Sequence, residues 1–283
     1  MKLISAQEKH YGLERQGGIM KENKIRRLLN ENAPTTSTRM WSVWPFYTEV
    51  VGSTHFFDYI EFVAEYSPFT QMDLENMARA AELYEMGSMI KVDFQNRGYV
   101  AQKAVASGFQ AILFADHHTP EEVEETIRMM KPDMLGTGRV GFPNRRVIGT
   151  TPHIPQMDHA SRLDDVVLAF MIEKEEAMEH LEEICSIPGV DMLQFGPSDY
   201  SMSAGMNRNE NIAALKEIER KMIRTALEHG IAPRCEIQFP EDAQYYIDLG
   251  VRHFSLGDQF KIQKSFWENE GRKMRNIADG LIL

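Results

Sequence analysis

The chain has little of what several protein classes need. Only two of its 283 residues are cysteines, Cys185 and Cys235, and they do not form a CxxC pair. This argues against a disulfide scaffold or a zinc ribbon and favours a reducing, cytoplasmic environment. Positive charge is also scarce, because 31 Lys and Arg stand against 42 Asp and Glu, which gives a formal charge of −11. Such an acidic chain is not suited to nonspecific binding of nucleic acid or of an anionic membrane.

Long apolar runs are missing as well. The longest one, Val166–Ile172, has seven residues, whereas a membrane-spanning helix needs roughly 20. The first residues, MKLISAQEKHYGLER, contain no apolar stretch of the kind that a signal peptide carries. We therefore expect a cytoplasmic protein that neither crosses a membrane nor is anchored to one.

From residue 40 onward the chain shows a regular alternation of short apolar segments with longer segments of helical periodicity. This alternation is typical of βα units around a parallel sheet. The eight strand candidates are Met40–Trp44, Asp58–Val63, Ser88–Val92, Gln110–Phe114, Val166–Ile172, Asp191–Phe195, Ile231–Ile237 and Arg252–Leu256. Eight units in about 240 residues predict an α/β protein with a (β/α)8 TIM barrel rather than an open Rossmann sheet, and no GxGxxG follows the first strand.

Three segments differ from this repeat. Residues 1–39 are polar and form an expected N-terminal extension, so that residues 40–283 make up a single barrel domain. The segment Gly136–Ala160 is longer than an ordinary connection, and loops of this length are often functional. The C-terminal segment Ile262–Leu283 is rich in apolar side chains such as Trp267. We expect it to form a helix that packs on a neighbouring subunit, which predicts a homo-oligomer.

In a barrel of this kind the active site forms where the strands end, so polar residues just after each apolar run are candidates. They are Glu65, Tyr66, Lys91, Asp116, His117, His118, Glu173, Asp199, Glu236, Gln238 and Asp258. Glu173 and Asp199 follow neighbouring strands, and two such carboxylates suit a hard divalent cation such as Mg²⁺ or Mn²⁺. Each also has an ordinary interpretation, since Glu173 can be a first-turn helix charge and Asp199 a helix N-cap.

Several motifs resemble those of a known family. The segment GVDMLQFGPSDYSMSAGM contains Asp199, and Glu173 lies 26 residues before that Asp. Shorter matches are MWSVWP, FFDYIEFVAEYSP, MIKVD and ASGFQAILFADHHTPEEVEE. From about residue 21 onward the chain is similar to the class II, metal-dependent pyruvate aldolases of the HpcH/HpaI family. Members of that family include the 2,4-dihydroxyhept-2-ene-1,7-dioate and 2-dehydro-3-deoxyglucarate aldolases.

The resemblance implies a barrel of the phosphoenolpyruvate/pyruvate type in which Glu173 and Asp199 bind Mg²⁺ or Mn²⁺, with Co²⁺ as a further option. Backbone N–H groups around Ser198 and Asp199 would hold the carboxylate of a pyruvate-like substrate. The metal would act as a Lewis acid toward the enolate, so that no Schiff-base lysine is needed. Because the family's members exchange a C-terminal helix between subunits, the resemblance also implies a homo-oligomer based on dimers, up to a hexamer.

The sequence departs from the family's pattern in the pocket. Tyr66 stands where the family has its active-site His, and Val63 stands where it has the Asp that supports that His. Lys91 aligns with the family's enolate-stabilising Arg and keeps the charge but not the bidentate fork. Met171 replaces a Gln that commonly comes two residues before the metal-binding Glu. The group that transfers the proton therefore has to be another residue, or the reaction has to be a different one.

Three residues are candidates for the remaining catalytic roles. Lys91 would steady the enolate charge and contact the substrate; otherwise, a lysine that ends a core strand needs a buried acid partner. Tyr66 would hydrogen-bond an alkoxide, although an unperturbed phenol is a poor base and the side chain suits a pocket wall equally well. If the fourth strand continues, Asp116 and His118 share one face. His118 would then be a replacement base, or it belongs to an exposed pair with His117.

These residues favour a metal-dependent lyase that makes or cleaves a C–C bond of a 2-keto acid, with a small-molecule 2-keto acid and an aldehyde as partners. A second hypothesis is a 2-keto acid decarboxylase or condensing enzyme of the same superfamily, because the changed pocket would suit a different electrophile. A third is a catalytically silent barrel that binds a metal or a keto acid, because the family's His and Arg are both replaced. Enolisation of pyruvate would separate an active enzyme from a silent one.

Overall fold

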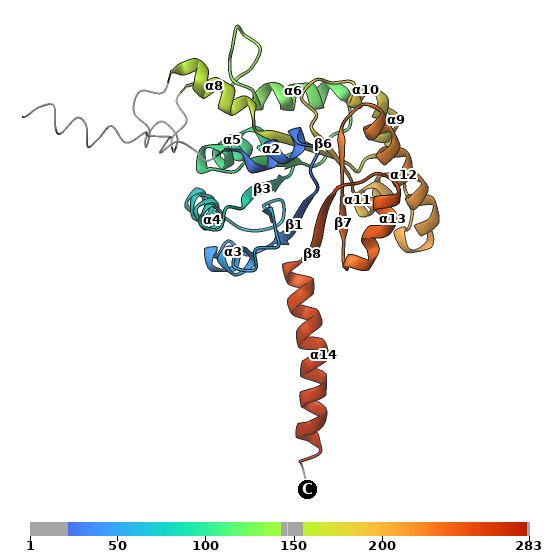
Figure 1. Cartoon of the computed structure of the whole chain (residues 1–283). Coiled ribbons are helices and arrows are strands. Elements are labelled where there is room, and N and C mark those ends of the chain that lie inside the picture. The colour runs from blue at the N-terminus through green and yellow to red at the C-terminus, as the bar shows by residue number, and fades with distance from the viewer. Residues whose placement is uncertain (1–21, 143–145, 147–154, 282–283) are drawn as a thin grey trace, which may run out of the picture.

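The computed structural model describes residues 22–142, 146 and 155–281, and these form a closed barrel of eight parallel strands (Figure 1). The strands are β1 (Thr35–Met40), β2 (Tyr59–Val63), β3 (Gly87–Val92), β4 (Ala111–Phe114), β5 (Val167–Ile172), β6 (Met192–Phe195), β7 (Ala232–Ile237) and β8 (His253–Asp258). Each strand pairs in parallel with the next one in the sequence, and β8 pairs with β1. The predicted (β/α)8 TIM barrel is confirmed.

Seven of the strands lie within two residues of their predicted bounds, and β1 is the exception. It is predicted at Met40–Trp44 but lies at Thr35–Met40, and Pro45 already begins helix α3 (Pro45–Gly52). Strands such as β4 (AILF) and β5 (VLAFMI) are recognisable as apolar runs, whereas β1 has the sequence TTSTRM. Its Ser37 and Arg39 side chains bond to charged groups of the barrel interior, so a search for hydrophobicity misses this strand.

Two separate clusters of apolar side chains bury the two faces of the strands. Ile60 and Phe62 of β2 belong to the outer cluster, which packs beneath the helices. Tyr59 of the same strand belongs to the inner cluster, which fills the barrel. Ile25 of α2 (Lys24–Asn30) joins the inner cluster, and Asn23 bonds to the backbone of Gln110 at the start of β4. Helix α2 therefore closes the amino-terminal end of the barrel.

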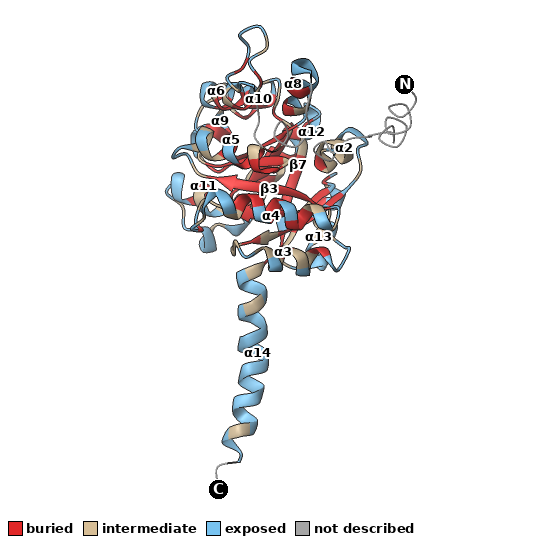
Figure 2. Cartoon of the chain, turned by 90° about the vertical axis from the view of Figure 1, so that its left-hand side faces the viewer, coloured by how far each residue is buried: buried red, intermediate tan, exposed pale blue. Residues whose placement is uncertain are grey.

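Helices cover the outside of the barrel (Figure 2). After α2 and α3 they are α4 (Gln71–Leu83), α5 (Arg97–Ser107), α6 (Pro120–Met130), α8 (Gln156–Asp164), α9 (Glu175–Glu179), α10 (Leu181–Cys185), α11 (Pro197–Ser203), α12 (Ile212–Glu228), α13 (Ala243–Asp248) and α14 (Gln259–Asp279), with 3-10 turns at Arg208–Glu210 and Pro240–Asp242. Thr70 and Asp73 form a capping box at α4, and Thr119 caps α6 just before Pro120. Across the described residues no helix is long and apolar enough to span a membrane.

Helix α14 stands apart from the other helices and projects away from the barrel (Figures 1 and 2). Its start is attached to the barrel, because Gln259 accepts hydrogen bonds from the backbone of Trp41 and Ser42. The rest of the helix has no buried residue. Its exposed apolar side chains are Phe260, Ile262, Phe266, Trp267, Met274 and Ile277. In a (β/α)8 barrel the helices form an outer ring, and α14 does not take its place in that ring.

Candidate active site

Glu173 directly follows β5 and is almost fully buried, with 1% of its surface exposed. Its Oε1 atom accepts a hydrogen bond of 2.9 Å from the backbone N–H of Asp116. Asp116 has a φ of 61°, so the chain turns sharply after β4 and its N–H meets the end of the neighbouring strand. Gly196 approaches the same carboxylate closely, because a Cβ atom at Gly196 would lie 2.6 Å from Oε2 of Glu173. Backbone atoms of two loops therefore enclose the Glu173 carboxylate.

The second carboxylate oxygen of Glu173, Oε2, is buried and has no hydrogen-bond partner among the described residues. Burial raises the pKa of Glu173 to about 7, although the charge of Lys91 and the hydrogen bond from Asp116 oppose this shift. The negative charge of Asp199 raises it further. A buried carboxylate oxygen without a partner is costly, and a divalent cation would satisfy it. The site therefore fits a hard cation such as Mg²⁺ or Mn²⁺.

Asp199 approaches Glu173 from the next βα unit. It lies in the first turn of α11, where Pro197 occupies the start of the helix and fixes its direction after β6. Within the described ranges, no group of three or more His, Cys, Asp and Glu side chains is placed to hold a metal ion. Glu173 and Asp199 are the two carboxylates that the sequence predicts as metal ligands. This number is sufficient for Mg²⁺, which usually keeps several waters beside one or two carboxylates.

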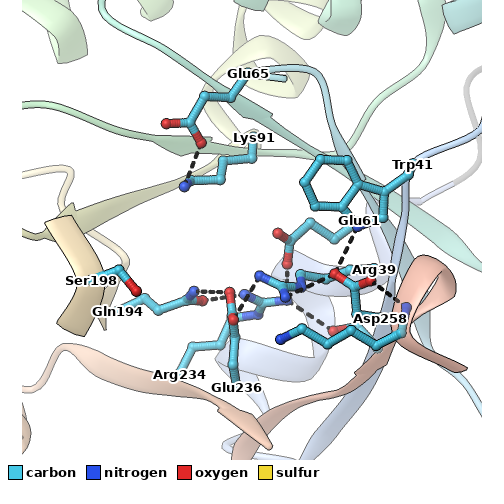
Figure 3. Close-up of polar contacts among 12 residues, drawn as sticks. Arg39, Trp41, Glu61, Glu65, Lys91, Gln194, Ser198, Arg234, Glu236 and Asp258 are labelled. Atoms are coloured by element: carbon cyan, nitrogen blue, oxygen red, sulfur yellow. Dashed lines mark hydrogen bonds and ion pairs between the residues drawn. The ribbon is translucent and has the colours of Figure 1, made fainter. Parts of the chain in front are cut away.

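Lys91 is the last residue but one of β3 and is buried, and its Nζ lies 2.5 Å from Oε2 of Glu65 (Figure 3). Burial lowers the pKa of Lys91, but the negative charges of Glu173 and Glu65 outweigh that effect, and the net result is a raised pKa. Lys91 therefore carries a positive charge at neutral pH. Glu65 is the buried acid partner that a lysine in a core strand needs. The charge of Lys91 also acts on Glu173, which agrees with a role in the active site.

Tyr66 lies beside Lys91 at the mouth of the barrel. Its ring stacks on Trp41 with 6.0 Å between the ring centroids and an interplanar angle of 16°. The Nζ of Lys91 lies 5.6 Å from the centre of the Tyr66 ring. Burial and a hydrogen bond with Glu65 raise the pKa of the Tyr66 phenol. Tyr66 therefore stays protonated at neutral pH, so that it can donate a hydrogen bond but is unsuited to act as a base.

The structure places both histidines of the HH pair away from the two carboxylates. The Nδ1 of His118 lies 3.0 Å from Oε2 of Glu176 on an exposed part of the surface, and its backbone N–H donates to Glu122. His117 is buried under the helices, where Nε2 lies 2.8 Å from Oγ1 of Thr126 and also contacts Arg97. Strand β4 ends at Phe114. The alternation of inward and outward side chains along a strand therefore does not extend to His118.

A polar network inside the barrel was not foreseen from the sequence. At its centre is Arg234 of β7, which is fully buried and ion-paired with Glu61 of β2. The guanidinium group also donates to the Tyr59 hydroxyl at 2.8 Å, to Ser37 Oγ at 3.0 Å and to Gln194. The signal in the sequence is the placement of Arg234 and Glu236 two residues apart on an otherwise apolar strand, which turns both side chains to one face.

This network continues to the carboxyl ends of the strands (Figure 3). Gln194 donates to Glu236, and Glu236 pairs with Arg39 at 2.6 Å. Arg39 also pairs with Asp258 at 2.9 Å, and Asp258 accepts a hydrogen bond of 2.7 Å from the indole N–H of Trp41. The Trp41 ring stacks on the Tyr66 ring. The polar network of the barrel interior therefore extends to the wall of the candidate site.

Comparison with known proteins places this fold and site in a family. The family model "HpcH/HpaI aldolase/citrate lyase" matches residues 69–258, which is more than half of the chain. A hydroxypyruvate/pyruvate aldolase of Delftia acidovorans is 24% identical over 243 residues, which cover 82% of this chain and 87% of the relative. A 2-keto-3-deoxy-L-rhamnonate aldolase of Klebsiella pneumoniae is 23% identical over 211 residues, with 75% and 78% covered.

Solved structures show the same barrel. An HpcH/HpaI aldolase from Desulfitobacterium hafniense superposes with a TM-score of 0.80 at 17% identity, covering 89% of this chain and 96% of that one. Macrophomate synthase superposes with a TM-score of 0.78 at 18% identity, covering 99% of both chains. At such identities these likenesses show the fold alone. Together with the family model they confirm the resemblance: the chain belongs to the HpcH/HpaI aldolase/citrate lyase family. It is a carbon–carbon lyase of the aldolase class.

Proposed function

We propose that this chain is a divalent-metal-dependent aldolase that makes or cleaves the C3–C4 bond of a 2-keto acid, between the carbon that becomes the pyruvate-type enolate and the carbon of the aldehyde partner. One observation carries the proposal: Oε2 of Glu173 is buried without a hydrogen-bond partner among the described residues, at the mouth of a barrel and close to Asp199 and Lys91. The relatives named above as pyruvate and keto-deoxy-sugar aldolases support the choice of a 2-keto acid as the donor.

Glu173 and Asp199 are the residues that would hold the metal, with Mg²⁺ or Mn²⁺ as the expected ion and Co²⁺ as a further option. When bound there, the metal supplies Lewis-acid stabilisation of the negative charge that develops on the substrate oxygen. The backbone N–H groups at Ser198 and Asp199 are proposed to orient the substrate carboxylate, because the first N–H groups of a helix lack partners within it.

Lys91 supplies a fixed positive charge beside the carboxylate pair. The ion pair with Glu65 holds its ammonium group in place, and a preorganised charge in a buried site stabilises developing negative charge without reorganisation. The raised pKa of Lys91 keeps the charge present through the neutral range. Lys91 therefore takes the role of steadying the enolate charge, as a single cation rather than as a bidentate donor.

Tyr66 is the proposed proton donor toward the alkoxide of the aldehyde partner. Its raised pKa keeps the phenol protonated, and its ring is held between Trp41 and Lys91. His118, the other candidate, pairs with Glu176, whereas Tyr66 contacts Lys91 and Glu65. The contacts of the two side chains therefore favour Tyr66 for this role, acting as an acid in the direction of C–C bond formation.

The assembly and location that we propose follow from other observations. The exposed apolar face of α14 suits packing against a second copy of the chain, so that the enzyme would be a homo-oligomer based on dimers, up to a hexamer. Cys185 and Cys235 are both free and buried, which suits a reducing cytoplasm.

The test is the exchange of pyruvate methyl protons in D₂O, followed by NMR with Mg²⁺ and by mass spectrometry with Mn²⁺ or Co²⁺. We expect the wild-type protein to accelerate exchange only when metal is present. Glu173→Gln and Asp199→Asn should lower the rate by at least about 100-fold, because the buried site then lacks one charge. Glu228→Gln, at the exposed end of α12, is the matched control and should exchange like wild type. Absence of exchange by the wild type with all three metals would contradict the proposal.

A further inference from the structure

Tyr66, the proposed proton donor, lies at the mouth of the barrel and is 58% exposed. An exposed side chain ordinarily moves among several rotamers, and each rotamer points the hydroxyl in a different direction. Here the Tyr66 ring is supported on one side by the Trp41 ring, which stacks on it, and the Nζ of Lys91 lies 5.6 Å from its centre. The direction of the phenol therefore depends on how firmly Trp41 is held.

Trp41 is held by the junction between β8 and α14. Its indole N–H donates to Oδ2 of Asp258 at 2.7 Å (Figure 3). Its backbone N–H donates to Oε1 of Gln259 at 2.9 Å, and the backbone N–H of Ser42 donates to the same oxygen at 3.0 Å. The first bond fixes the ring and the other two fix the backbone, so both ends of the Trp41 side chain are restrained.

Asp258 is itself held firmly. It is buried, and its Oδ2 also accepts a hydrogen bond of 2.9 Å from Nη2 of Arg39. Its Oδ1 accepts a hydrogen bond of 3.1 Å from the backbone N–H of Lys261 and thereby caps α14. Both carboxylate oxygens are engaged, and a hydrogen bond to a charged acceptor is stronger than one between neutral groups. Asp258 is therefore a rigid support for the Trp41 ring.

The phenol of Tyr66 lies near the two carboxylates of the candidate site. Burial and Glu65 raise the pKa of Tyr66 most, and the negative charges of Asp199 and Glu173 raise it further. The effect of a charge on a pKa falls with distance, so the phenol is within reach of both charges. A small change in the tilt of the Tyr66 ring therefore moves the proposed proton donor relative to the site.

We propose that Asp258 and Gln259 are positioning residues for Tyr66, because they fix Trp41 and the Trp41 ring orients the phenol toward the aldehyde partner. The proposal rests on the aldolase function proposed above. In bond formation the enolate carbon bonds to the aldehyde carbon, and the carbonyl electron pair moves to the aldehyde oxygen. That oxygen takes the phenol proton, which water then replaces. A displacement of about 1 Å in such a group can cost about 100-fold in rate, so the rate depends on a rigid support.

Two partial reactions separate this role from a general defect in structure. Exchange of the pyruvate methyl protons requires no aldehyde, and the protonated Tyr66 is unsuited to act as its base. Aldol addition requires the aldehyde and the proton donor. The quantity to measure is the turnover number for aldol addition divided by the rate constant for exchange, both with Mg²⁺. The acceptor is glycolaldehyde or the best substrate in a panel of small aldehydes.

Asp258→Ala and Gln259→Leu should each lower this ratio by about 10-fold or more, because Trp41 loses the support of its ring or of its backbone. Asp258→Asn and Gln259→Glu keep an acceptor oxygen and should recover most of the ratio. Gln263→Leu is the matched control, since Gln263 lies one turn further along α14 and donates to the Tyr47 hydroxyl instead. A wild-type ratio in both Asp258→Ala and Gln259→Leu would overturn the inference.

Tyr66→Phe shows whether the effect passes through the phenol. This variant alone should lower the ratio by about 100-fold, since it removes the proton donor. Adding Gln259→Leu to Tyr66→Phe should lower the ratio no further, because the support then has no donor to orient. Additive losses in the double variant would overturn the inference. Exchange by the wild type without aldol addition to any aldehyde would also overturn it, since no alkoxide would form.

The mobility of Trp41 gives a second readout, which requires neither metal nor turnover. The chain has three tryptophans, so Trp44→Phe together with Trp267→Phe leaves Trp41 alone. In this background, time-resolved fluorescence anisotropy should gain a nanosecond decay in Asp258→Ala and Gln259→Leu. An unchanged decay in both would overturn the inference. The added decay, combined with no pyruvate exchange by the wild type, would support the fixation of Trp41 and overturn the aldolase proposal.

Discussion

Glu173 is held in place by neighbours that lie far from it in the sequence. The N–H of Asp116 donates to one carboxylate oxygen, and Gly196 leaves just enough room for the other. Burial raises the pKa of the side chain, while the charge of Lys91 limits the shift. At the scale of single residues, the candidate site therefore depends as much on a glycine and a backbone N–H as on the carboxylates themselves.

Gly196→Ala should damage the site while leaving the fold intact. Gly196 has a φ of −107°, which alanine adopts without strain, so the effect comes from the new methyl group. That group would lie 2.6 Å from Oε2 of Glu173 and 2.7 Å from its Cβ. We expect an unfolding free energy lower by about 1–3 kcal/mol and a metal affinity lower by about 10-fold or more. Gly271→Ala, where the added Cβ meets open space, is the control; equal metal affinity in both variants would contradict this account.

His253 should make the stability depend on pH. Burial, helped by the charges of Arg234 and Arg252, lowers the pKa of His253 from 6.5 to about 4. Above pH 6.5 the ring is neutral in both states. Between pH 6.5 and 4 the unfolded chain takes up a proton that the folded chain does not bind, so the unfolding free energy falls, by up to roughly 3 kcal/mol from this group. Urea titrations at pH 7 and 4.5 should therefore show a smaller loss in His253→Gln than in wild type, and identical losses would refute the prediction.

The sequence was informative about site residues where each one follows an apolar strand. Glu173 directly follows β5, an uninterrupted apolar run, and Lys91 follows the apolar pair Met89 and Ile90 within β3. The placement of His118 depends instead on the φ of 61° at Asp116, a turn that no residue pattern announces. Oε2 of Glu173 is buried without a hydrogen-bond partner among the described residues because distant segments pack around it, and a single sequence does not reveal such contacts.

At the scale of secondary-structure elements, ion pairs and hydrogen bonds connect the strands inside the barrel, in addition to apolar packing. Arg234 of β7 is surrounded by Glu61 of β2, Gln194 of β6 and Ser37 of β1. Burial lowers the pKa of Arg234, but Glu61, Tyr59 and Glu236 together outweigh burial, and the net result is a raised pKa. Buried ion pairs are costly to break, because the remaining charge stays in an apolar interior.

Arg234→Met should lower the unfolding free energy by about 3–5 kcal/mol, because Glu61 then remains as an unpaired buried carboxylate. The double variant Arg234→Met, Glu61→Leu should recover much of that loss, since it leaves no buried charge. Arg220→Met, which breaks the pair with Glu217 on the surface of α12, should cost less than about 1 kcal/mol. Urea unfolding of the four proteins gives the comparison. A double variant no more stable than Arg234→Met alone would show that the loss is not caused by the unpaired charge.

The same network explains which elements the sequence could predict. Strands with two apolar faces, such as β4 and β5, lie within two residues of their predicted bounds. β1 does not, because Ser37 and Arg39 serve the polar interior and leave no apolar run. Helix α6, in contrast, begins at a signal that is local in the sequence, because Thr119 caps it and Pro120 starts it.

At the scale of the whole molecule, α14 is the feature that a single barrel does not explain. Phe266 is 64% exposed and Trp267 is 65% exposed, and no residue of the helix is buried. Apolar surface of this extent is typical of an interface. Light scattering should therefore report a mass above that of one 32.5 kDa chain. The double variant Phe266→Ser, Trp267→Ser should shift the protein toward the monomer; a monomeric wild type would contradict the proposed exchange of this helix.

Metal binding tests the central claim most directly, because the account depends on Glu173 and Asp199 holding one divalent ion together. Calorimetric titration of the metal-free protein with Mn²⁺ gives both the stoichiometry and the affinity. We predict one ion per chain, and an affinity weaker by about 100-fold or more in Glu173→Gln and in Asp199→Asn, since each variant removes one of two protein ligands. One ion bound with wild-type affinity in both variants would contradict the account.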